Sequence, residues 1–297
     1  FNLNFNLPFK IIKLIYLIFK ALLYLKNKKI NKVISIGGYM SLPVMISAKI
    51  LSLPIFLIEP NLVLGRGNSI FLNFAKKIFC YSKELSNFPK KYIHKIEIIK
   101  PLISRLFYDL KKKERFNDKF CFLIIGGSQG AKIFDNIFSE IIINLSKNFQ
   151  FKVIQQTSEE NIKNLKNIYD SKNIENIIFN FDQNLINLID ASDLCITRAG
   201  ATSLAEISFL NKPFIAIPLP TSKDNHQMKN AEYYEKLWCC WILNQNMLNK
   251  EKLFEIISKI LKKKSELNEK KNNLEKLNYK NSWNDINQKI MKTINEN

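Results

Sequence analysis

The segment from Ala191 to Gln227 (ASDLCITRAGATSLAEISFLNKPFIAIPLPTSKDNHQ) constrains the fold more than any other part of the chain. A short apolar run at 194–197 predicts a strand, and a tight turn at 198–200 leads directly into a helix that begins at Ala201. The first backbone N–H groups of such a helix have no partner within it, and together with the helix dipole they favour a phosphate or diphosphate. Glu206 lies one to two turns inside this helix, where a carboxylate repels phosphate but accepts hydrogen bonds from ribose hydroxyls. The segment therefore indicates a nucleotide diphosphate bound across one helix start.

A second strand-to-helix turn precedes this segment. The fully apolar run Phe120 to Ile125 is followed by Gly126-Gly127-Ser128-Gln129-Gly130-Ala131, and a helix is expected from about Lys132. The run is neither a strict GxGxxG nor a GK[ST] phosphate loop, so it gives weak support for a dinucleotide or ATP. The glycines let a ligand approach the backbone and Ser128 can donate to phosphate, although a plain strand-to-helix turn is the alternative.

The N-terminal part predicts a parallel sheet. Strands are expected at 32–36 and 54–58, with a helix at 41–51 between them, and this β-α-β order requires parallel pairing. The second strand ends at Glu59-Pro60-Asn61, and ligands in such folds bind just beyond the carboxyl ends of the strands. Asn61 is therefore either a ligand contact or a turn former.

The chain of 297 residues is long enough for one large or two ordinary α/β domains. The charge-rich run at 109–118 (DLKKKERFND) marks the expected boundary. We expect an N-terminal domain at 1–110 and a C-terminal domain at 111–282, with a last helix at about 283–297 that can pack back on the first domain.

Charge and cysteine content restrict the partners only in part. The net charge of +19 indicates attraction to an anion, or else reflects the general over-use of lysine in this chain. The lysines and arginines are scattered instead of gathered on one face with exposed aromatic residues, which disfavours nucleic acid. The five cysteines form no CxxC pair and have no ligand spacing with the two histidines, so we expect no metal site, no disulfide framework and a cytosolic protein.

Residues 9–26 predict a strongly apolar helix. Lys10, Lys13 and Lys20 interrupt it, so it is a poor transmembrane span, and at 100° per residue they share one stripe about 80° wide. The remaining surface is almost wholly apolar. Either the helix is buried in a large domain, or it packs on one side and dips into an anionic membrane surface on the other.

Three runs together resemble one family: IGGYMSLPVMISAKILSLPIFLIEPN, LIIGGSQGAK and DLCITRAGATSLAEISFLNKPFIAIPLPTSKDNHQMKNA. The family is the peptidoglycan glycosyltransferase that adds N-acetylglucosamine to undecaprenyl-diphospho-N-acetylmuramoyl-pentapeptide (lipid I) to make lipid II. The resemblance implies a GT-B fold, that is, two Rossmann-like doubly wound domains facing a cleft. It also implies UDP-N-acetylglucosamine as donor, lipid I as acceptor, transfer with inversion, no metal or other cofactor, and a peripheral position on the cytoplasmic face of the bacterial inner membrane.

The resemblance also assigns roles by position. Asn61 matches an asparagine that contacts the donor sugar, Ser128 matches the serine near the diphosphate, and Asp182 lies where main-chain groups hold uracil. The helix start under the nucleotide is formed by Ala201, Thr202, Ser203, Leu204, Ala205 and Glu206, with Glu206 on the ribose. Gln227 lies in the loop that touches N-acetylglucosamine.

Two departures from the family concern the acceptor side. The family's first domain opens with a GGTGGH-type loop, which has no counterpart here, so we expect that the sequence begins inside that domain. The arginine of the family's Asn-Pro-Val-Arg run is replaced by Ile103, and Arg105 could substitute only after a local shift. We name no catalytic base, since neither His94 nor His226 is a good candidate. Another GT-B sugar-nucleotide enzyme, such as a 2-epimerase, remains the alternative, and a basic nucleic-acid-binding protein is the alternative from another class.

Overall fold

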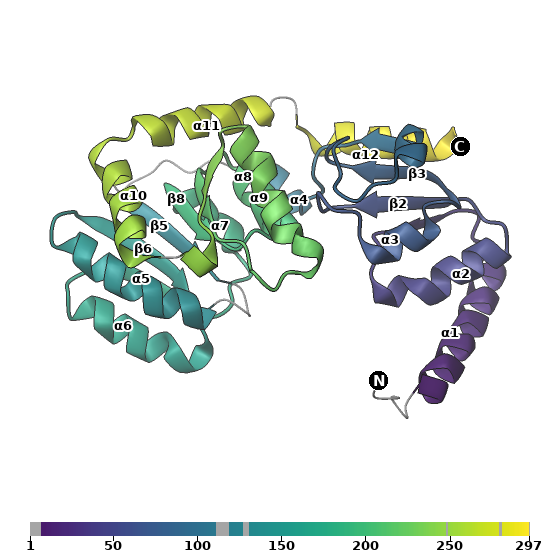
Figure 1. Ribbon diagram of the computed structural model, residues 1–297, viewed down its shortest axis with the longest axis horizontal. Helices are drawn as coiled ribbons and strands as arrows, with labels where there is room; N and C mark the ends of the chain where they lie inside the picture. The colour runs from purple at the N-terminus through teal and green to yellow at the C-terminus, as the bar shows by residue number, and fades with distance from the viewer. Residues whose placement is uncertain (1–6, 111–118, 127–130, 248, 279–280, 297) are drawn as a thin grey trace. The chain divides into compact units, whose positions relative to one another are not determined.

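The computed structural model describes residues 7–110, 119–126, 131–247, 249–278 and 281–296. They divide into an N-terminal unit, Phe1–Pro101 with Ser282–Asn297, and a C-terminal unit, Leu102–Asn281 (Figure 1). Each unit is built on one parallel sheet. The predicted α/β class is therefore confirmed.

The N-terminal unit contains four parallel strands in the order β1-β2-β3-β4. Its elements are α1 (Leu7–Asn27), β1 (Val33–Ser35), α2 (Leu42–Ile50), β2 (Ile55–Glu59), α3 (Arg66–Phe71), β3 (Ala75–Cys80), β4 (Ile96–Ile98) and α12 (Trp283–Asn295). Every residue of β2 is buried, as expected for a central parallel strand covered on both faces. An ion pair between Lys289 and Glu97 (3.1 Å), together with a hydrogen bond from Lys32 Nζ to the Ile294 carbonyl, holds α12 in this unit.

The C-terminal unit contains six parallel strands in the order β10-β9-β8-β5-β6-β7. The strands are β5 (Phe120–Ile125), β6 (Phe151–Gln156), β7 (Glu175–Phe179), β8 (Leu194–Thr197), β9 (Phe214–Ala216) and β10 (Cys240–Ile242). The helices are α4 (Arg105–Tyr108), α5 (Ala131–Ser146), α6 (Ile162–Asp170), α7 (Leu185–Ala191), α8 (Ala201–Phe209), α9 (His226–Lys236), α10 (Lys250–Lys262) and α11 (Ser265–Leu277). This is the strand order of a doubly wound Rossmann-like sheet. Successive strands are added outward on one side of β5 up to β7, and from β8 onward they are added on the other side.

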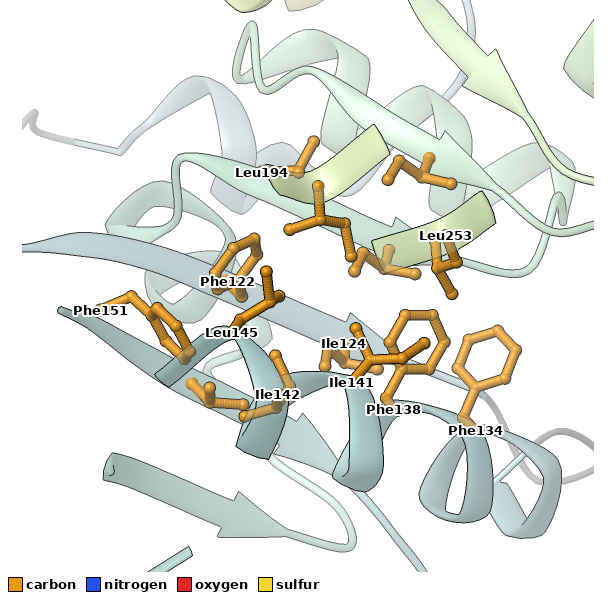
Figure 2. Close-up of a cluster of buried hydrophobic side chains, with 14 of the residues drawn as sticks. Phe122, Ile124, Phe134, Phe138, Ile141, Ile142, Leu145, Phe151, Leu194 and Leu253 are labelled. Carbon is orange, nitrogen blue, oxygen red and sulfur yellow. The ribbon is translucent and has the colours of Figure 1, made fainter. Parts of the chain in front are cut away.

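The core of the C-terminal unit has two layers, one on each face of the sheet. Figure 2 shows part of one layer, where α5 packs on the sheet through Phe134, Phe138 and Ile141. The rings of Phe134 and Phe138 lie 5.3 Å apart in an edge-on arrangement, and both are fully buried. Burial of apolar area on this scale is the main force that holds a helix on a sheet.

The boundary between the units differs from the expected one. It lies between Pro101 and Leu102, ahead of the charge-rich run that was expected to mark it. Ile103 and Phe107 are buried in the same cluster as Leu204 of α8, so the segment before the charged run belongs to the C-terminal unit. Arg105 lies on the exposed side of α4 and pairs with Asp109 at 3.4 Å.

Helix α1 exposes a long apolar surface. Phe9, Ile12, Ile15 and Phe19 are each at least 60% exposed, while Leu25 is buried. The Ser47 hydroxyl of α2 donates to the Ile18 carbonyl at 2.9 Å, which holds α1 against α2. None of the described helices is long and apolar enough to cross a membrane.

Replacing Phe138 with alanine should destabilise the C-terminal unit by about 3–5 kcal/mol, because it removes a buried ring and leaves a cavity. Urea unfolding followed by tryptophan fluorescence measures this, since Trp238 and Trp241 lie in the same unit. The control is Asn136→Ala, an exposed position on the same helix, which should change stability by no more than about 0.5 kcal/mol. Equal effects of the two substitutions would contradict the assigned packing of α5.

Candidate functional site

The centre of the C-terminal sheet is the pair β5–β8. These strands pair in register from Phe122 with Leu194 to Ile125 with Thr197, so both end at the same edge. The chain passes from β5 toward α5 on one side of this point and from β8 into α8 on the other. In doubly wound sheets such a reversal opens a crevice at the carboxyl ends of the strands, where ligands bind. Ser128, predicted to contact the diphosphate, lies outside the described residues.

The start of α8 presents unsatisfied backbone donors. Gly200 is its N-cap residue, in an extended conformation, and as a glycine it supplies no side-chain cap. Thr202 and Ser203 are exposed and Ala201 is half-buried, whereas Leu204 and Ala205 are buried in the core. The first three residues can therefore present N–H groups to an anion. Leu204 and Ala205 hold the helix in place.

Glu206 is the titratable group nearest to this helix start along α8. Its side chain is half-buried, and burial raises the pKa of its carboxyl group. Among the described residues no cation forms an ion pair with it. A half-buried carboxylate without a counter-charge is suited to accept hydrogen bonds from neutral hydroxyl groups.

Gln227 joins two loops of the carboxyl edge. Its Oε1 accepts hydrogen bonds from the Ala199 N–H (3.2 Å) and the Leu219 N–H (2.9 Å), which ties the turn before α8 to the loop after β9. One helical turn further, the buried Asn230 donates from Nδ2 to the Ala199 carbonyl at 3.2 Å. Both backbone groups of Ala199 are thus held by α9, while no hydrogen bond from Gln227 Nε2 is found among the described residues.

The position of Gln227 differs from the predicted one. Gln227 was expected to lie in a loop, but His226 and Gln227 form the first turn of α9. The two preceding residues have positive φ angles of 54° and 55°, a left-handed conformation that polar residues such as Asp and Asn tolerate. Because the segment before Gln227 is polar, the sequence did not indicate that a helix begins at His226. The sequence analysis assigned no role to Asn230.

Asp182 follows β7, the outermost strand on its side of the sheet. Its Oδ1 accepts a hydrogen bond from the Asn184 N–H at 2.6 Å, so the carboxylate shapes the turn before α7. Its side chain is engaged locally, which leaves its main chain as the part that can contact a ligand. The preceding residue, Phe181, exposes 77% of its surface.

Arg198, in the turn that joins β8 to α8, had no predicted role, yet its side chain is buried. Only 8% of its surface is exposed, and its Nη1 donates to the Ile217 carbonyl at 3.1 Å. Its Nε and Nη2 atoms have no hydrogen-bond partner among the described residues. Whether an arginine after a strand points outward or inward depends on the tertiary packing, so the sequence carried no signal for it.

Asn61 lies in the N-terminal unit, where a buried carboxylate organises the loop after β2. Glu59 is 2% exposed and accepts hydrogen bonds from the Gly65 N–H (2.8 Å), from Asn68 Nδ2 (2.9 Å) and from the Asn61 N–H (3.2 Å). The side-chain Nδ2 of Asn61 also donates to the Glu59 carboxylate at 3.3 Å. This network presents Asn61 at the carboxyl end of β2. Glu59 and Asn68 are the members that the sequence pattern did not identify as functional.

A close backbone approach fixes the neighbouring loop. Gly37 and Gly38, after β1, have φ angles of 82° and 83°. A side chain at Gly67 would lie 2.8 Å from the Gly38 nitrogen, and one at Gly37 would lie 2.9 Å from Asn68 Oδ1. These positions require glycine, and they let the loop after β1 lie directly against the first turn of α3.

The chain matches known protein families over both of its units. Residues 121–289 match the glycosyltransferase family 28 C-terminal domain, and residues 1–80 match the glycosyltransferase family 28 N-terminal domain. A Pelagibacter ubique protein is 46% identical over 291 residues, which cover 98% of this chain and 82% of that protein. It is named UDP-N-acetylglucosamine–N-acetylmuramyl-(pentapeptide) pyrophosphoryl-undecaprenol N-acetylglucosamine transferase.

Solved structures share the fold at lower identity. The crystal structure of Acinetobacter baumannii MurG matches with a TM-score of 0.78 at 21% identity, over 96% of this chain and 80% of that one. A UDP-GlcNAc 2-epimerase from Neisseria meningitidis, bound to UDP-GlcNAc, matches with a TM-score of 0.67 at 13% identity, over 96% and 81% of the two chains. These likenesses confirm the predicted GT-B class with its two Rossmann-like domains. The chain therefore belongs to glycosyltransferase family 28 and, within it, to the family of N-acetylglucosamine transferases that its three sequence runs resemble.

Proposed function

We propose that this chain transfers N-acetylglucosamine from UDP-N-acetylglucosamine to the muramoyl 4-hydroxyl of lipid I, with inversion, to give lipid II. The observation that carries the proposal is the start of α8 at Gly200 followed by the half-buried Glu206, which has no ion-pair partner in the described part of the chain. The chain is 46% identical to a protein named as this transferase. The more distant 2-epimerases share the fold at 13% identity or less, which supports no transfer of their activity.

The proposed donor site uses each residue differently. The N–H groups of Ala201, Thr202 and Ser203 face the diphosphate, and Glu206 accepts from the ribose hydroxyls. The main chain at Asp182 holds uracil, and the Gln227 amide donates to the sugar. Ser128 and Asn61 complete the set on the strength of the resemblance: Ser128 near the diphosphate, and Asn61 on the donor sugar.

Transfer requires that the bond between C1 of the sugar and the diphosphate oxygen breaks while the acceptor oxygen bonds to C1. The leaving UDP gains negative charge, which preorganised N–H donors at a helix start stabilise. A base must remove the proton of the acceptor hydroxyl. No described residue is assigned to that role.

We further propose that the protein binds the cytoplasmic face of the bacterial inner membrane through α1, where lipid I is presented. Phe9, Ile12, Ile15 and Phe19 form an exposed apolar surface on a helix that also carries exposed lysines. Such a helix lies in the interface between headgroups and acyl chains, and the lysines meet anionic lipids.

Purified protein should release UDP from UDP-N-acetylglucosamine only when a lipid I analogue is present. A coupled assay for UDP, run with and without the acceptor, measures this. Conversion of the donor to a 2-epimer without acceptor would instead identify an epimerase. UDP release at the same rate in both samples would contradict transfer to lipid I.

Glu206→Gln should weaken UDP binding by about 1–3 kcal/mol, because a charged hydrogen-bond acceptor is lost. The raised pKa also predicts a pH dependence. In the wild type, affinity is full above the pKa of Glu206 and falls as the pH is lowered through it, whereas the variant loses this dependence. Calorimetric titration with UDP at neutral and mildly acidic pH tests both expectations. Glu235→Gln, an exposed position on α9, is the control, and an unchanged affinity in Glu206→Gln would remove the ribose role.

Ile15→Ser combined with Phe19→Ser should reduce co-sedimentation with phosphatidylglycerol vesicles, because it places two hydroxyls in the apolar surface of α1. The matched control combines Leu106→Ser with Leu237→Ser, two exposed apolar positions of the C-terminal unit. Equal binding of the two double variants would mean that α1 is not the membrane contact.

A further inference from the structure

Arg198 is a buried cation without a carboxylate partner among the described residues. Its Nη1 bonds to the Ile217 carbonyl at the end of β9, and its guanidinium carbon lies 4.8 Å from the ring centroid of Phe134 in the first turn of α5. These contacts occupy one nitrogen and one face of the guanidinium. The Nε and Nη2 atoms are buried and have no hydrogen-bond partner among the described residues.

This arrangement costs stability in the free protein. Burial lowers the pKa of Arg198, since desolvation disfavours the charged form. Buried charges are normally paired. Lys270 shows the usual solution in the same unit: it is 1% exposed, lies over the rings of Trp238 and Trp241, and has Glu266 at 3.9 Å. Arg198 lacks such a counter-charge.

The location of Arg198 matches the place where a diphosphate would lie. Its backbone N–H donates to the Ile125 carbonyl at 3.4 Å, so the residue stands at the ends of the paired strands β5 and β8. Its guanidinium reaches the first turn of α5, and its backbone leads into α8. Arg198 therefore lies at the strand ends, in contact with the first turn of α5 and directly before α8, at the edge where an anion bound to either helix start would lie.

The two nitrogens also have the right mutual geometry. Nε and Nη2 lie on the same side of a guanidinium and point their N–H bonds in parallel, which matches two oxygens of one phosphate. A lysine offers a single point charge and cannot form this paired contact.

We infer that Arg198 binds the diphosphate of the donor through Nε and Nη2 and supplies the positive charge that stabilises the departing UDP. The inference rests on the proposed function for the identity of the donor. During transfer the acceptor oxygen bonds to C1 of the sugar and gives up its proton to a base. The electron pair of the broken C1–O bond stays on the β-phosphate, next to Arg198.

The test compares wild type, Arg198→Met and Arg198→Lys in calorimetric titrations with UDP, uridine and inorganic pyrophosphate. Arg198→Met should lower the affinity for UDP by about 10- to 100-fold, the loss expected for hydrogen bonds to a charged group, and leave uridine binding unchanged. Arg198→Lys should recover only part of the loss. Lys163→Met removes an exposed charge of the same unit and should behave as wild type.

Urea unfolding separates this role from a structural one. Without ligand, Arg198→Met should be no less stable than wild type, because a buried unpaired charge is removed. Pyrophosphate should raise the unfolding midpoint of wild type and not that of Arg198→Met. Loss of stability together with equal losses of uridine and UDP affinity would assign Arg198 to the fold and overturn the inference, as would an unchanged UDP affinity.

The same measurements distinguish failure of the inference from failure of the proposed function. If wild type binds pyrophosphate in an Arg198-dependent way but shows no preference for UDP, the anion site stands and the donor assignment fails. If wild type binds UDP and transfers the sugar while Arg198→Met does the same, the proposed function stands and the role of Arg198 fails. Wild type that binds neither UDP nor pyrophosphate would overturn both.

Discussion

The parallel pairing of β5 with β8 is the constraint on which the candidate site depends. Four successive residue pairs, from Phe122–Leu194 to Ile125–Thr197, align the two strand ends although more than sixty residues separate them in the chain. Parallel strands need such a crossover, and a crossover at the centre of the sheet places two helix starts at one edge. Without this register, the end of β5 and the turn at Arg198 to Gly200 would not lie at the same edge.

The rest of the C-terminal unit stabilises that edge. Helix α9 holds Ala199 by both its N–H and its carbonyl, through Gln227 and Asn230, so the turn before α8 has little freedom to move. The buried Leu204 and Ala205 anchor α8, while Thr202 and Ser203 in its first turn are exposed. Rigid donors of this kind bind an anion without the cost of ordering them first. A rigid fold of this kind can hold the buried Arg198, which has no carboxylate partner among the described residues, and the half-buried Glu206 in fixed positions. A free loop could not.

In the N-terminal unit, a buried carboxylate fixes the loop that carries the candidate site residue. Glu59 collects hydrogen bonds from Asn61, Gly65 and Asn68 and so orders the whole loop after β2. The glycines at 37, 38 and 67 allow the loop after β1 to approach the first turn of α3 closely. A buried charge that is fully hydrogen-bonded favours one loop conformation over its alternatives, because any rearrangement would leave it unsatisfied. Asn61 is thereby presented in a defined position at the carboxyl end of its strand.

The sequence by itself determined the class of the fold, the order of the elements and the residues that open α8. Apolar runs of strand length are local properties, and they placed β5 and β8 at their observed limits. The family resemblance rested on three contiguous runs of residues, which are also local features of the sequence. Only the tertiary structure decided the boundary before Leu102, the helical start at His226 and Gln227, and the burial of Arg198, Glu59 and Asn230. Burial and hydrogen-bond partners depend on which distant segments pack against a residue, and no pattern within one segment contains that information.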